Sequence, residues 1–240
     1  MNLSALLLLA LTVTGLGTLL AYLVSGGVPL IGIDDAAITR NYAENIANGH
    51  GIVYYVGGER VEGSTSFLWT LIVAVTYLIT PTPEVLILAL GFACATASVF
   101  AVLALGTLLA RRLDLPQRAV AITTAIGLLG LPGFFFWSVF TMMELGLWSA
   151  VLLTLTWRLA RLAERPKPWS FSIVGLGILL PLIRPEGIAV TLGLMVLAAL
   201  LMWRFPRGLK LAVVAAVASF AAVTAFRLIY FGYPVPNTFY

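Results

Sequence analysis

Two adjacent carboxylates begin the longest polar stretch of this chain, "DDAAITRNYAENIANGHGIVYYVGGERVEGSTSFLWT". Five of the ten acidic residues and the only histidine lie in it: Asp34, Asp35, Glu44, Glu59, Glu62 and His50. A carboxylate within hydrogen-bond reach of a substrate hydroxyl can act as a general base. We expect residues 35–48 to form a short amphipathic helix at a membrane surface, with Asp34 and Asp35 at its N-terminus, where the helix dipole favours negative charge. The alternative role for the pair is ordinary helix capping.

Three further charged residues stand isolated among apolar segments. Glu144 lies in "FTMMELGLW", and Arg184 and Glu186 lie in "LIRPEG". Ionisable groups near membrane depth are costly and usually face a partner or a cavity. The alternatives are an ion pair that closes a helical hairpin at 184–186 and an interfacial helix cap at Glu144.

Several other chemistries are not supported. His50 has no second histidine and no cysteine pair with which to hold zinc. No glycine group is followed by the Lys and Ser/Thr of a phosphate-binding loop. Cys94 is alone, so a disulfide within the chain is excluded.

Composition identifies an integral membrane protein. Of the 240 residues, 61% are hydrophobic and 10% are charged, and the mean hydropathy is +1.04. A soluble domain carries about 25% charged residues. The net charge of +4 reflects basic residues in short connections rather than nucleic-acid binding.

Seven apolar segments predict an all-α polytopic helix bundle in one module, residues 1–240. They are residues 3–24, 85–110, 119–140, 145–162, 171–183, 187–203 and 211–230. Residues 67–80 are too short to span, so we expect a re-entrant or interfacial helix there, and eight spans if this segment crosses.

Three basic clusters orient the bundle. They are Arg111, Arg112 and Arg118; Arg158, Arg161, Arg165 and Lys167; and Arg204, Arg207 and Lys210. The positive-inside rule makes all three cytoplasmic. The loop at 25–66, the turns at 141–144 and 184–186, and the tail at 232–240 then face outward.

Four ordered motifs resemble those of the GT-C superfamily of membrane glycosyltransferases, and in particular the bacterial terminal arabinofuranosyltransferase group. They are the acidic first loop, "FTMMELGLW", "LIRPEG" and "YFGYPVPNTFY". This chain departs from the group at Ala37, where relatives usually carry an aromatic residue. Relatives also extend past the last motif, so the chain is either a fragment with a C-terminal continuation after Tyr240 or a minimal form.

The resemblance implies a seven-span module in the bacterial cytoplasmic membrane with its active site facing outward. The expected reaction moves a sugar, arabinofuranose or a hexose such as mannose, from a polyprenyl-phosphate donor to a glycan, lipid or protein acceptor. Nucleic acid is not an expected partner. Mg²⁺ or Ca²⁺ could be held by carboxylates, but polyprenyl-monophosphate donors do not demand a cation.

We assign catalysis to Asp35, Asp34 and Glu144, and donor or substrate binding to Arg184, Glu186, His50, Arg40, Glu62 and Asn237. Arg184 suits the lipid phosphate because guanidinium binds phosphate through two N–H groups. Two competing hypotheses remain: a lipid-linked-sugar transporter or flippase, and a non-catalytic membrane assembly subunit.

The topology can be tested by cysteine labelling. A cysteine at Asn48 should react with a membrane-impermeant maleimide from outside, and one at Pro166 only after the membrane is opened. Labelling of both from the same side would contradict the orientation.

Overall fold

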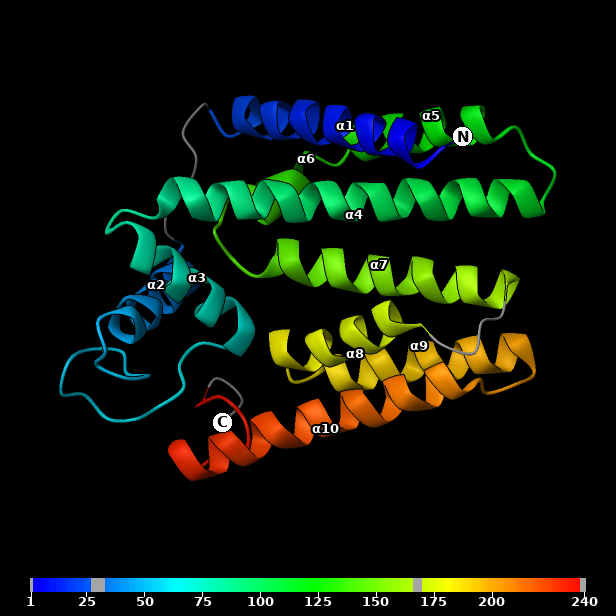
Figure 1. The fold of residues 1–240 in the computed structure, drawn as a ribbon. Coiled ribbons are helices and arrows are strands. Elements are labelled where there is room, and N and C mark those ends of the chain that lie inside the picture. Colours follow the sequence, from blue (N-terminus) through cyan, green and yellow to red (C-terminus); the bar gives the residue numbers. More distant parts are fainter. Residues whose placement is uncertain (1, 27–32, 166–169, 238–240) are drawn as a thin grey trace. The chain divides into compact units, whose positions relative to one another are not determined.

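The computed structural model describes residues 2–26, 33–165 and 170–237, and these residues divide into two compact units. The described part of the chain is helical (Figure 1), as the sequence predicts. Lys167 of the second basic cluster and the last three residues of the C-terminal motif lie outside the described residues. The side chain of Asp34 also lies outside what is described.

The first unit contains residues 1–31 and 88–164. Its helices are α1 (Leu3–Val24), most of α4 (Glu84–Arg112), α5 (Gln117–Leu129), α6 (Pro132–Phe135), the π-helical segment η1 (Phe136–Phe140) and α7 (Leu145–Glu164). The buried Phe135 packs on α1 at Gly17, where any Cβ atom would overlap its ring. Glycine is therefore required for this close approach.

The ends of α4 and α7 are joined by ion pairs in the first unit. Arg111 Nη2 and Arg112 Nε lie 2.9 and 3.2 Å from the two carboxylate oxygens of Glu164. These pairs join the end of α4 that carries Arg111 and Arg112 to the end of α7 that carries Arg158 and Arg161, while the side of the membrane on which the clusters lie stays a prediction.

The second unit contains residues 32–87 and 165–240. Its helices are α2 (Asp34–Ala47), α3 (Phe67–Ile79), the start of α4, α8 (Phe171–Ile183), α9 (Gly187–Met202) and α10 (Arg207–Tyr230). Helices α8, α9 and α10 pack against one another, and α2 packs on α3. The pair α2 and α3 lies toward the end of α10 that leads to the C-terminus (Figure 1).

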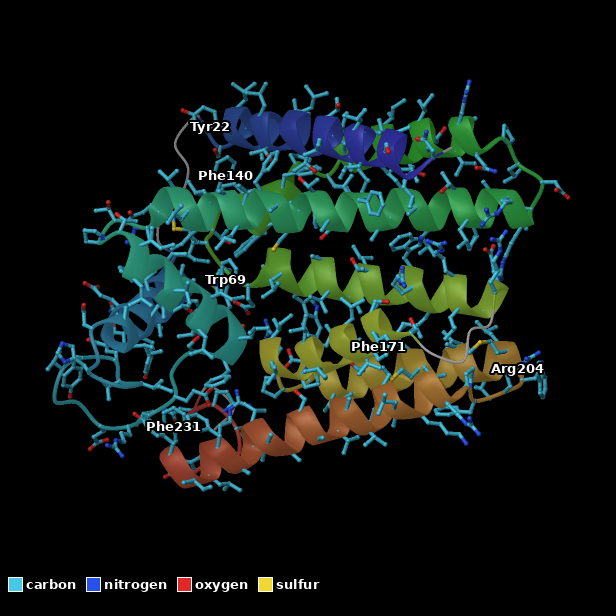
Figure 2. All side chains as sticks on the ribbon, viewed as in Figure 1. Tyr22, Trp69, Phe140, Phe171, Arg204 and Phe231 are labelled. Carbon is cyan, nitrogen blue, oxygen red and sulfur yellow. The ribbon has the colours of Figure 1, made fainter. Side chains whose placement is uncertain are left out.

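The third basic cluster lies at the opposite end of this unit. Arg204 and Phe231 mark the two ends of α10 (Figure 2). The first loop and the C-terminal tail thus share one end of the unit, and the basic connection between α9 and α10 occupies the other.

Three helices of the described residues are long and apolar enough to cross a membrane: α1, α4 and α10. A fourth span results if α5 and the α6–η1 segment count as one. Length and composition therefore identify a membrane protein, while the count of seven spans stays a prediction. Helices α3, α8 and α9 are apolar but only 13, 13 and 16 residues long, and α7 carries Arg158 and Arg161 near its end.

The single segment expected at residues 119–140 is bent instead. Its two parts, Gln117–Leu129 and Pro132–Phe140, meet at 74°. Pro132 occupies the first turn of α6 and has no amide hydrogen to continue the preceding helix, so the chain begins a new helix in a new direction.

Candidate functional site

A buried ion pair joins the first loop to α10. Arg227 donates from Nε to Glu62 Oε2 at 2.7 Å and from Nη2 to Oε1 at 3.0 Å. The side chains are only 1% and 6% exposed. This two-point geometry is strong and directional because both groups are charged and the guanidinium is planar.

Burial raises the pKa of the Glu62 carboxyl above its ordinary value, and the Arg227 guanidinium acts in the opposite direction. Glu62 was a predicted substrate-binding residue. In the structure its two oxygens are occupied by Arg227, which gives this side chain a role in fixing the loop.

Further contacts attach the same loop to the C-terminal end of α10. The amide of Ile52 donates to the Tyr230 hydroxyl at 3.1 Å, and the guanidinium of Arg60 lies 5.0 Å from the centre of the Tyr230 ring. The amide of Asn237 donates to the backbone oxygen of Glu62 at 2.9 Å. The loop and the tail are therefore held on α10 by both backbone and side-chain groups.

Hydroxyl groups then fix the loop on α2 and α3. Tyr42 donates to the Val61 oxygen at 2.5 Å and accepts from the Gly63 amide at 3.0 Å. Ser64 lies 3.3 Å from the Thr39 hydroxyl and 2.8 Å from that of Thr70. The orientation of α2 is thus linked, through the loop, to the end of α10.

Asp34 and Asp35 occupy the first turn of α2, as predicted. The N-cap position is Ile33, which makes no side-chain cap hydrogen bond. The side chain of Asp35 is exposed at the N-terminus of this helix. Asp35 is therefore available to a molecule in the surrounding medium.

Arg184 and Glu186 form the ion pair that the short connection suggests. Arg184 Nε lies 2.6 Å from Glu186 Oε1, and the two side chains are 31% and 44% exposed. Arg184 caps the end of α8, and Gly187 begins α9 so close to Leu180 that a Cβ atom would collide with its backbone. The structure therefore contains the ion pair that closes the helical hairpin. The partial exposure of the pair is also compatible with a role in binding the donor.

Of two other predicted binding residues, Arg40 has side-chain partners and His50 is exposed. Arg40 pairs with Glu84 at the start of α4 and donates to the Tyr77 hydroxyl at 3.2 Å. These partners raise the pKa of Arg40 although burial opposes them. His50 is exposed in the turn after α2, between Gly49 and Gly51, which both have positive φ angles.

Glu144 belongs to the first unit and is 1% exposed. It immediately precedes α7, in the short connection from the π-helical segment η1 that also contains the buried Met142, whose φ is 59°. Such π-helical segments and left-handed non-glycine residues occur often at functional sites. The arrangement singles out Glu144 within its unit, and its role toward a substrate stays a prediction.

One pocket among the described residues of the second unit is too small for a sugar. A pocket of about 10 Å³ is lined by Tyr42, Ile46, Ile52, Glu62, Ser64, Phe67, Thr70 and Leu71. A single water molecule needs roughly this volume. Groups of three or more His, Cys, Asp or Glu side chains that could bind a metal are absent from the residues that the structure describes.

No protein-family model, curated protein or solved structure matches the chain. The apolar helices α1, α4 and α10 place the described residues in the class of helical membrane proteins. Arg227 is the site residue that the sequence analysis missed. Its signal was a single arginine in the last turn of a long apolar helix, where a partner is expected.

Glu62→Gln should release the loop from α10. The substitution leaves the Arg227 charge buried without its counter-charge, which typically costs about 3–5 kcal/mol. We expect a lower thermal midpoint in detergent and faster trypsin cleavage after Arg60, followed by mass spectrometry.

Glu59→Gln is the matched control, because Glu59 is exposed in the same loop and loses the same charge. Equal cleavage of both variants and the wild type would contradict the proposed tie. The double variant Glu62→Leu with Arg227→Leu should be less destabilised than Arg227→Leu alone.

Proposed function

We propose that the chain is a membrane glycosyltransferase that moves a sugar from a polyprenyl-phosphate donor to an acceptor on the outer face of the bacterial cytoplasmic membrane. The proposal rests on the resemblance of its four motifs to those of GT-C enzymes. The sugar is arabinofuranose or a hexose, and the acceptor is a glycan, lipid or protein.

One structural observation supports this function most directly. Asp35 and Asn237 are about 200 residues apart in the chain. The elements that carry them are nevertheless both linked, through the loop at Glu62, to one end of the second unit. A surface that accepts a lipid-linked donor needs such charged groups at a membrane boundary rather than within the bilayer.

In the proposed reaction, Asp35 accepts the proton of the acceptor hydroxyl while the hydroxyl oxygen attacks C1 of the sugar. The bond from C1 to the phosphate oxygen breaks, and the polyprenyl phosphate leaves with the electron pair. Arg184 binds this phosphate, where guanidinium offers two parallel N–H donors. The donor is already activated by its phosphate, so the reaction requires no nucleotide.

The other residues divide into two groups in this proposal. Glu144 orients a sugar hydroxyl, and Glu186, His50 and Asn237 contribute to binding. Glu62 and Arg40 act as positioning residues, since their charges are matched within the protein. Asp34 either supports Asp35 or binds a divalent cation with it.

The competing classes fit the charge placement less well. A transporter usually binds its substrate near the bilayer midplane through ionisable groups or broken helices. In α10, Arg227 lies in the last turn and is paired. A purely structural assembly subunit would not require an exposed carboxylate at Asp35.

Asp35→Asn should lower the rate of sugar transfer by about 10²–10⁴-fold, the usual effect of losing a general base. Asparagine keeps the shape of the side chain, so folding and membrane insertion should be unchanged. The assay is transfer of radiolabelled sugar from polyprenyl phosphate in proteoliposomes, with Asp34→Asn measured in parallel.

Glu44→Gln supplies the control, since Glu44 is exposed on the same helix and carries the same charge. It should retain the wild-type rate. Wild-type rates in both aspartate variants would remove the catalytic role and leave the pair as part of a helix terminus.

A further inference from the structure

Residues 54–56 form an exposed apolar tip in the first loop. Tyr54, Tyr55 and Val56 are 44%, 63% and 64% exposed. The contiguous run exceeds the scattered single apolar side chains that are normal on a protein surface, and such exposure marks interaction sites.

The conformation of this tip is fixed by hydrogen bonds. The side-chain amide of Asn45 donates to the backbone oxygens of Val53 and Tyr54, at 2.9 and 3.0 Å. The amide of Gly58 donates to the Tyr55 oxygen at 2.9 Å, and Gly57 has φ of 80°. The aromatic side chains are therefore presented by a defined turn.

In a bilayer that α10 spans, the contacts of the loop with α10 would set the depth of the loop. The interval from Lys210 to Tyr230 rises about 30 Å along the helix axis, equal to the hydrocarbon core of a bilayer. Tyr230, at the end of this interval, bonds to the Ile52 amide. Tyr55 is three residues beyond Ile52, a reach of at most about 10 Å.

The chemistry of the tip matches the boundary between lipid and water. Tyrosine is enriched there because its ring is apolar and its hydroxyl is polar. Arg60, stacked on Tyr230 at the same end of α10, is complementary in charge to lipid phosphate, although the neighbouring Glu59 offsets part of this attraction.

We propose that residues 54–56 insert into the lipid headgroup region at the C-terminal end of α10 and anchor the first loop to the membrane. The Tyr54 and Tyr55 rings contact the upper acyl chains, and Arg60 faces the phosphates. Through Asn45 and Tyr42 the anchored tip is connected to α2. The inference requires that α10 spans the bilayer and does not depend on sugar transfer.

Lipid quenching of a fluorophore tests this inference. In a Cys94→Ala background, Val56→Cys is labelled with a small environment-sensitive dye, and the protein is placed in nanodiscs whose lipids are brominated near the top of the acyl chains. Val214→Cys, at an exposed position of α10, gives the lipid standard, and Asp114→Cys, in the exposed turn after α4, gives the aqueous standard. Circular dichroism and gel filtration verify that each variant is folded.

We expect brominated lipid to quench the dye at residue 56 several-fold more than the dye at residue 114. Iodide in the aqueous phase should quench the dye at residue 56 less than the dye at residue 114. Adding Tyr54→Ser and Tyr55→Ser should reduce the lipid quenching several-fold. Quenching equal to that at residue 114 would overturn the anchor.

Two further outcomes separate the alternatives. If a soluble acceptor glycan protects the dye from iodide in nanodiscs while lipid quenching is absent, the tip is a carbohydrate-binding surface and the lipid anchor is wrong. An enzyme without sugar transfer whose dye at residue 56 is still quenched by lipid would refute the proposed function alone and support the anchor.

Discussion

The polar end of the second unit depends on the pairing of one buried charge. Arg227 lies in the last turn of an apolar helix and is 1% exposed, and a charge at that depth is tolerated only with a counter-charge. Glu62 is the partner, supplied by a loop 165 residues away in sequence. The loop must therefore fold against α10, and the contacts of Ile52, Arg60 and Asn237 follow from that docking.

We expect this pair to contribute more to the specificity of loop placement than to net stability. The desolvation of two charges offsets much of their attraction, so a buried pair is weak support for a large stabilisation. Its fixed geometry nevertheless selects one register of the loop on the helix. The position of the loop in turn fixes α2, which carries the exposed Asp35. The hydrogen bonds that connect them come from Tyr42 and from the hydroxyls of Thr39, Ser64 and Thr70. The catalytic role that we propose for Asp35 would depend on this support, because small displacements of reacting groups reduce rates strongly.

Local patterns predicted the local structure well. The amphipathic helix after Asp34–Asp35 and the apolar helices at residues 67–79 and 171–183 follow from local sequence patterns. The partner of Arg227 did not follow, because long-range pairing leaves no spacing signal in a single sequence. The bend at Pro132 was missed because the apolar run continues across it. The predicted number of spans does not follow from the structure, because several helices are short for a bilayer.

We propose that the end of the second unit built around Glu62 and Arg227 receives a polyprenyl-phosphate sugar. Photo-crosslinking tests it most directly, with a polyprenyl-phosphate sugar that carries a diazirine close to the phosphate, added to the protein in nanodiscs. The account predicts crosslinks in peptides that contain the start of α2 and the 184–187 turn, and their loss when unlabelled donor is added in excess. Crosslinks that fall only near Arg204 and Lys210, or that unlabelled donor does not reduce, would contradict it.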